Sequence, residues 1–220
     1  MPAPAFGYVA QPNPGTLDIY QNPRVTKSDL YLLSLAQGGL PYIFNTLDRA
    51  AHLRKRKIIG SALSERSMRL FEPTLMEQTN IFIEEISRSC SAYINLTERC
   101  QRLAMDFAAH LGFGFPLDLQ TKEENRFLPR GITLANYRIN SYMNFPFLSK
   151  LGFEHLFKRS TLRTRWRSTV ERMITSRVSQ DKNAKADFYS FVANNLSVGS
   201  EGIQHSELFA ESLFFMSAGT

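Results

Sequence analysis

Residues 45–66 read N-T-L-D-R-A-A-H-L-R-K-R-K-I-I-G-S-A-L-S-E-R, a basic stretch with the pattern of a capped helix. Asp48 is a good N-cap residue, so we predict a helix over residues 49–60. His52 and Arg56 are four positions apart on that helix, which places an imidazole and a guanidinium side by side. Such a pair can hold one carboxylate or phosphate group. A solvated basic helix surface would show the same pair, so the spacing alone leaves both interpretations open.

The charge of the whole chain is positive, with 26 basic and 20 acidic residues among 220 and a net charge of +6. Two clusters supply most of the excess, at residues 52–57 and 158–177. Solvated helix faces account for such clusters, although a basic patch can also meet nucleic acid or an acidic membrane surface. Neither a zinc-finger spacing nor an aromatic strand signature accompanies them, so we expect no nucleic-acid partner.

The cysteines and the hydropathy argue against further classes of protein. Cys90 and Cys100 are the two cysteines of the chain. They are too few for a disulfide framework, and their placement follows no zinc-site pattern. No apolar run reaches the roughly 18 residues that a membrane-spanning helix needs, so we expect no membrane anchor in this chain. Residues 1–15 carry four prolines and no charge, which predicts an irregular leader over residues 1–17 rather than a signal or transit peptide.

Most of the remaining chain has the pattern of helices joined by loops, without a strong run of alternating strands. We predict a short helix that begins at Ser64 and is interrupted by Pro73, followed by a long amphipathic helix. Another helix is expected over residues 122–139, and a basic one over residues 157–178. Ser206 is expected to cap a final apolar helix. The predicted fold class is therefore mainly α.

Three further segments complete a pattern that begins with residues 45–66. They read F-G-F-P-L-D-L at residues 113–119, K-A-D-F-Y-S-F-V at residues 185–192 and E-L-F-A-E-S-L-F-F-M-S-A-G-T at residues 207–220. Taken in this order, the four segments resemble the cytochrome P450 family of heme-thiolate monooxygenases. The resemblance is strongest to the filamentous-fungal members that act in secondary-metabolite pathways, and it runs over residues 18–220.

The resemblance implies a truncated cytochrome P450 fold in which residues 18–220 form one partial domain. This domain would run from about the second helix of the family to the first half of its long central helix. The C-terminal half, which holds the heme ligand, would be absent. The apolar end of the chain agrees with that expectation, because a helix normally closes with Gly or Asn and then polar residues. Residues 122–178 would form two helices and a loop over the substrate channel.

The resemblance also implies roles for single residues. His52 and Arg56 would hydrogen-bond a heme propionate, which is the carboxylate chemistry that their spacing allows. Ala218 and Gly219 match the small pair of the family motif Ala/Gly-Gly-x-Asp/Glu-Thr, which opens a groove for dioxygen. Close helix packing would explain two small residues equally well. Thr220 falls at the variable position, so the proton-relaying acid and alcohol would follow it and we expect no catalytic residue here.

The iron ligand of the family is a cysteine in the loop Phe-x-x-Gly-x-Arg-x-Cys-x-Gly. Neither Cys90 nor Cys100 stands in such a loop, so we expect no metal ligand in this chain. We therefore expect the chain alone to be inactive and not to bind heme as the family does. The alternative is a non-catalytic remnant or pseudoenzyme that acts, if at all, as a binding or interaction protein.

The function implied by the resemblance is oxygen insertion into a lipophilic small molecule, with heme as cofactor and electrons from an NADPH-dependent reductase. Four aromatic residues of the channel segment agree with a lipophilic substrate: Tyr137, Tyr142, Phe145 and Phe147. Full-length relatives lie on the endoplasmic reticulum membrane. Without an anchor, the chain as written is expected in the cytoplasm.

Overall fold

The computed structural model describes residues 18, 22, 24–35, 40–89, 93–150, 161–185, 187–193 and 205–218. In this part of the chain the regular elements are all helices, which confirms the mainly α fold. They follow one another as η1 (Asp29–Ser34), α2 (Arg49–Ala62), α3 (Glu65–Ser87), α4 (Leu96–Phe113), α5 (Leu128–Asn144), α6 (Phe147–Lys150), α8 (Thr161–Val178), α9 (Phe188–Ala193) and α10 (His205–Ala218).

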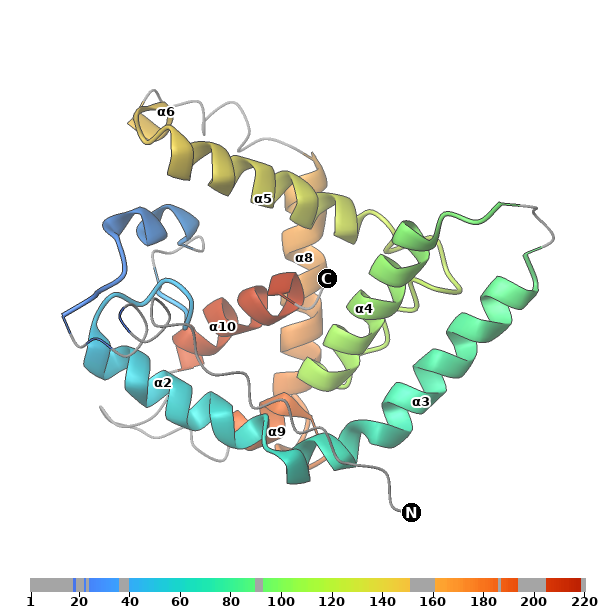
Figure 1. Cartoon of the computed structure of the whole chain (residues 1–220). Coiled ribbons are helices and arrows are strands. Elements are labelled where there is room, and N and C mark those ends of the chain that lie inside the picture. Colours follow the sequence, from blue (N-terminus) through green and yellow to red (C-terminus); the bar gives the residue numbers. More distant parts are fainter. Residues whose placement is uncertain are drawn as a thin grey trace, which may run out of the picture.

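Helix α10 lies in the middle of the arrangement, with other helices around it (Figure 1). Both α4 and α8 pack against α10, and α5 lies above it in the view of Figure 1. Helices α2 and α9 contact each other below α10, and α3 packs along α4. This central position explains why α10 is apolar on most of its circumference, since neighbours approach it from several directions.

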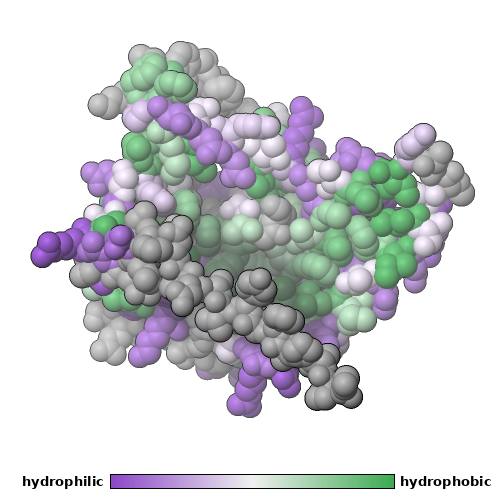
Figure 2. Space-filling model, viewed as in Figure 1, coloured by the Kyte–Doolittle hydropathy of each residue, from purple (hydrophilic) through white to green (hydrophobic). Residues whose placement is uncertain are grey.

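The hydrophobic core lies between α4, α8, α9 and α10. Its buried members include Met105, Ala109, Phe113, Val170, Met173, Phe188, Val192 and Met216. Ile59 and Ala62 extend the same cluster to the last turns of α2. This packing fixes α2 relative to α10, and with it the direction of the basic side chains on α2. On the face seen in Figure 2 the centre is hollowed, and hydrophobic residues gather to its right, over α3 and α4.

The predicted interruption at Pro73 is wrong, because α3 is one helix of 23 residues that contains this proline. Proline removes the hydrogen bond to the carbonyl four residues earlier, here that of Arg69. Both residues are exposed, so water can satisfy that carbonyl. Phe71 and Gln78 are buried on either side of the proline and hold the two parts of the helix against the protein. Tertiary packing therefore outweighs the local helix-breaking signal.

Two other predicted boundaries also need correction. Helix α5 begins at Leu128 rather than at residue 122 and continues to Asn144. Pro129 occupies its first turn, where a fixed φ suits helix initiation and the missing N–H costs no hydrogen bond. Helix α10 begins at His205, so Ser206 lies inside the helix rather than in front of it. The predicted leader at residues 1–17 lies outside the described residues. None of the helices in the described ranges is both long and apolar enough to cross a bilayer.

Candidate functional site

Helix α2 begins where its sequence predicts and carries His52 and Arg56 one turn apart. The Asp48 carboxylate accepts a hydrogen bond from the backbone N–H of Ala51 at 2.6 Å, which satisfies one of the unpaired donors of the first turn. His52 is half-buried and Arg56 is exposed. Within the described residues, neither side chain takes part in a hydrogen bond or an ion pair. The pair is therefore available to an anion.

Lys27 is a third basic group at this place, and reasoning from the sequence missed it. Its ammonium donates hydrogen bonds to the backbone carbonyls of Ile43 and Phe44, at 3.0 and 2.8 Å. These bonds hold it beside the loop that precedes α2. Burial, followed by the positive charges of Lys27 and Arg56, lowers the pKa of the His52 imidazole. Only the tertiary fold brings Lys27 to α2, so no local sequence signal could have found it.

We call Lys27, His52 and Arg56 the basic cluster, and its electrostatics are those of an anion site. Among the described residues, no carboxylate offsets the positive charges that act on the His52 imidazole. An anion held by the cluster would be attracted by each member and would raise the pKa of His52 again. A carboxylate suits these donors, because a guanidinium can bind both of its oxygens while an ammonium and an imidazolium donate single bonds.

A different side of α2 carries basic residues in a contrasting environment. Lys55 is fully buried, and its ammonium lies 2.9 Å from a carboxylate oxygen of Glu211 and 3.1 Å from one of Glu207. Arg54 pairs with Glu207 at 3.2 Å. Burial raises the pKa of the Glu211 carboxyl, while Lys55 and the backbone N–H of Ile43 act against that rise. We call Arg54, Lys55, Glu207 and Glu211 the ionic bridge, since it joins α2 to α10.

A cavity of about 240 Å³ lies between α5, α10 and the loop before α2. Phe214 and Ala218 belong to its α10 wall, and Phe44 contributes from the loop. Ala218 is the last residue of α10 that the structure describes, and it is exposed at this cavity. Gly219, the other small residue of the predicted oxygen groove, lies outside the described residues. The structure thus brings Ala218 to a cavity wall, while its role there stays a prediction.

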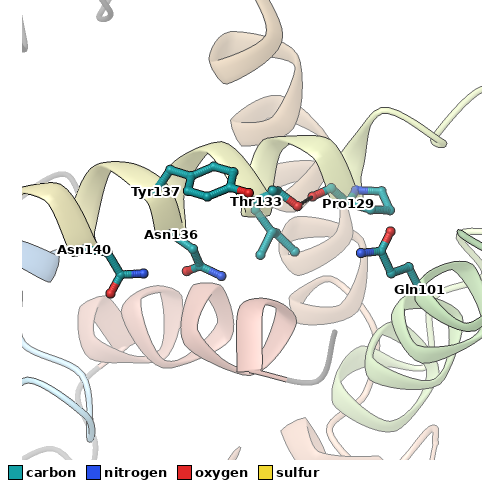
Figure 3. Close-up of a pocket in the computed structure, with 7 residues that line it drawn as sticks. Gln101, Pro129, Thr133, Asn136, Tyr137 and Asn140 are labelled. Carbon is teal, nitrogen blue, oxygen red and sulfur yellow. Dashed lines mark hydrogen bonds between the residues drawn. The ribbon is translucent and has the colours of Figure 1, made fainter. Parts of the chain in front are cut away.

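A second cavity, of about 230 Å³, adjoins the first along α5 (Figure 3). Asn136 and Asn140 line both cavities, and in Figure 3 their side chains extend from α5 toward α10. Gln101 reaches the second cavity from α4. The described residues that line the two cavities include no charged side chain. Adjoining spaces of this size and polarity suit a small uncharged molecule.

Comparison with known proteins decides what kind of fold carries this site. The sequence profile of the family described as "Cytochrome P450" matches residues 23–220. The chain belongs to the cytochrome P450 family. This membership confirms the resemblance in the sequence and agrees with a partial cytochrome P450 fold.

Fungal cytochromes P450 are among the similar curated proteins. Cytochrome P450 monooxygenase ataY of Aspergillus terreus is 27% identical over 143 residues, which are 63% of this chain and 62% of ataY. Cytochrome P450 monooxygenase apf7 of Gibberella fujikuroi is 23% identical over 211 residues, 86% of this chain and 40% of apf7. A cytochrome P450 monooxygenase of Gibberella zeae is 26% identical over 220 residues, 94% of this chain and 50% of that protein. The chain therefore covers 40 to 62% of the length of these three relatives.

Heme with electrons from a reductase is the cofactor system of cytochromes P450, and the basic cluster fits one part of heme. The two propionates of heme are carboxylates, the anions that the donors of Lys27, His52 and Arg56 suit. The iron ligand of the family is a cysteine, so the positions of the two cysteines of this chain have to be considered as well. Cys100 is exposed on α4 and lines neither cavity, and Cys90 lies outside the described residues. Within those residues, no three His, Cys, Asp or Glu side chains are grouped as a metal site.

Proposed function

We propose that this chain serves the oxidation of a lipophilic small molecule by heme monooxygenase chemistry, in a secondary-metabolite pathway of a fungus. The observation that carries the proposal is the position of the basic cluster next to the first cavity. Lys27 donates a hydrogen bond to the backbone of Phe44, and the same residue lines the cavity. An anion site and a small-molecule cavity thus share one loop.

Some residues of the chain would hold the cofactor, and others would shape the space for the substrate. Arg56 and Lys27 would bind the propionate edge, with His52 as an additional donor. When bound, heme supplies the activation of dioxygen. The ionic bridge would keep α2 at a fixed position on α10, so that the basic cluster and the α10 wall of the cavity keep their relative placement.

Further parts of the proposal rest on the family alone. Electrons would come from an NADPH-dependent reductase, and the working place would be the endoplasmic reticulum membrane. The aromatic residues Tyr42, Phe44 and Phe214 at the first cavity support a lipophilic substrate. Since neither cysteine stands in the thiolate loop of the family, we propose that the 220 residues alone bind heme through its propionates only and are inactive.

A matched pair of ligands tests the propionate role directly. The 220-residue chain is titrated with heme and with heme dimethyl ester, whose propionates carry no charge, and binding is followed by absorbance. We expect heme to bind at least tenfold more tightly than the ester, because the cluster meets a charged carboxylate only in heme. Arg56→Ala should remove most of that difference. The reduced, carbon-monoxide-treated chain should show no thiolate-type Soret band.

Arg66→Ala is the matched control, because it removes the same side chain from an exposed position on α3. It should leave the difference between heme and its ester unchanged. Equal affinity for heme and ester in the unaltered chain would contradict the propionate role and favour a binding protein without heme. A thiolate-type band from these 220 residues would refute the proposal that they are inactive alone.

A further inference from the structure

One wall of the first cavity is a group of three nearly parallel aromatic rings. The Phe214 ring lies 5.2 Å from that of Tyr42 and 5.8 Å from that of Phe44, with interplanar angles of 21° and 16°. The Tyr42 and Phe44 rings are themselves inclined by only 14°. The Tyr42 hydroxyl donates a hydrogen bond to the backbone carbonyl of Ser34 at 2.8 Å, so its polar atom is already engaged. This wall is therefore aromatic and apolar, which favours a ligand with a planar ring.

The wall that α5 contributes has the opposite character. Asn136 and Asn140 are one helical turn apart, and both are exposed at the two cavities. In the described part of the chain, neither side-chain amide makes a hydrogen bond. Each amide carries two donors and one acceptor. A ligand that fills the cavities without bonding to them would leave these groups desolvated and unpaired, which is costly. The pair therefore selects a ligand with a polar group at this place.

The charge around the first cavity indicates that this polar group is neutral. None of the described residues that line either cavity is charged. Burial raises the pKa of the Tyr42 hydroxyl and an interaction with the Ser34 side chain lowers it, while the smaller effects of Glu211 and Arg138 have opposite signs. The charges near this wall thus oppose one another. The described lining residues themselves offer no counter-ion to a carboxylate or an ammonium on the ligand, which would lose its hydration there.

We propose that the ligand of this site is a planar, uncharged molecule with one hydroxyl, carbonyl or amide group. The planar part lies on the rings of Tyr42, Phe44 and Phe214, and the polar group bonds to the amides of Asn136 and Asn140. These two asparagines are then the residues that determine specificity. The inference deepens the proposed function, on which it depends for the chemistry, but it concerns ligand selection alone.

The test uses the 220-residue chain and three probes with one ring system: naphthalene, 2-naphthol and 2-naphthoate. Equilibrium dialysis at neutral pH should show the tightest binding for 2-naphthol. Asn136→Leu and Asn140→Leu keep the branched shape and the number of heavy atoms of the side chain and remove the amide. Each should weaken the binding of 2-naphthol about five- to tenfold and leave naphthalene unchanged. Asn80→Leu is the matched control, since Asn80 is exposed on α3 and lines neither cavity.

Several results would overturn the inference. An equal loss of naphthalene and 2-naphthol in a leucine variant would mean that the asparagines only shape the wall. Tightest binding of 2-naphthoate would show a cationic site, and equal binding of the three probes would show no polar selection. If a leucine variant lacks the circular dichroism of the unaltered chain, Asn136→Ala and Asn140→Ala take its place. If 2-naphthol shows no preference but heme still binds more tightly than its dimethyl ester, only this inference is refuted. If 2-naphthol is preferred but heme and its ester bind equally, only the proposed function is refuted.

Discussion

The basic residues of α2 form two groups that share one helix but have opposite surroundings. Lys55 is fully buried between two carboxylates of α10, whereas Arg56, the next residue, is exposed and has no acidic partner among the described residues. A buried cation without a counter-ion would cost several kcal/mol, so Lys55 has to be neutralised from inside the protein. Solvent screens Arg56, and positive charge can accumulate around it. Neighbouring cations on one helix thus have different surroundings: Lys55 joins α2 to α10, and Arg56 is the one that we propose for an anion.

Removal of Lys55 should break the first group and have the largest effect on stability. Among the described residues, Lys55→Met leaves the buried carboxylate of Glu211 without its cation, while Glu207 keeps Arg54. We expect the free energy of unfolding to fall by about 3–5 kcal/mol, measured by urea denaturation followed by circular dichroism.

Lys57→Met is the control for that measurement, because Lys57 is exposed on the same helix. It should change the free energy of unfolding by no more than about 0.5 kcal/mol. The double variant Lys55→Met with Glu211→Leu should regain part of the loss, since it replaces a buried ion pair by apolar groups. Equal stability of the two methionine variants would mean that the ionic bridge does not hold α2 on α10.

The Glu211→Gln variant tests the ionic bridge through the pH dependence of the free energy of unfolding. It should destabilise less than Lys55→Met, because Glu207 still faces the Lys55 ammonium at 3.1 Å. Burial raises the pKa of Glu211 above its ordinary value of 4.5, so the folded chain binds more protons than the unfolded chain between the two pKa values. The contribution of Glu211 to stability is therefore full below pH 4.5 and is lost as pH rises through the folded-state pKa.

The measurement is urea denaturation of both proteins at a series of pH values. The advantage of the unaltered chain over Glu211→Gln should shrink as pH rises through that window. An advantage that grows with pH would show that the folded chain lowers the pKa of Glu211 instead. Asp106 titrates in the same direction because of its burial, but it is present in both proteins and cancels from the difference.

The features that could be predicted from the sequence are those that depend on residues close together along the chain. The N-cap at Asp48 and the turn-apart spacing of His52 and Arg56 are such parts, because a cap and a helix repeat involve only near neighbours. Lys27 could not be predicted, since its ammonium reaches the cluster through bonds to the carbonyls of Ile43 and Phe44. The interruption expected at Pro73 failed for the related reason that tertiary packing decides the outcome.

The ionic bridge is another feature that could not be predicted from the sequence, here because charge patterns do not reveal burial. In the sequence, Lys55 stands within a basic run and nothing distinguishes it from Arg56 or Lys57. The fold places α2 close enough to α10 for the carboxylates of Glu207 and Glu211 to lie opposite the buried Lys55. The pattern of charges predicts a solvated face and gives no sign that one cation of the run is inside. Only the structure distinguishes the buried, ion-paired Lys55 from the exposed Arg56.

Arg56→Met should have a much smaller effect on stability than Lys55→Met, although the two residues are adjacent. The Arg56 guanidinium is exposed and contributes only repulsion to the charges that act on His52. We expect a change in the free energy of unfolding within about 0.5 kcal/mol in urea denaturation. A loss as large as that of Lys55→Met would contradict the division of α2 into two groups.

The smallest change that we predict concerns the pKa of His52, and it tests whether Lys27 belongs to the basic cluster. Lys27→Gln keeps hydrogen-bond donors for the carbonyls of Ile43 and Phe44 but removes the charge. The pKa of His52, followed by NMR, should rise toward 6.5, because one of the two positive charges that lower it is gone. Lys57→Gln should leave it unchanged, and an unchanged value in Lys27→Gln would remove Lys27 from the basic cluster.

The same lowered pKa has a consequence for stability whose sign is fixed. The folded chain binds fewer protons at His52 than the unfolded chain between the folded-state pKa and 6.5. The contribution of His52 to stability is therefore present above pH 6.5 and is lost as pH falls through the folded-state pKa. Lys27→Gln should weaken this loss, while Glu211→Gln should not, because the two groups on α2 respond to different charges. A weaker loss in Lys27→Gln and an unchanged loss in Glu211→Gln would establish that one helix carries two independent electrostatic sites.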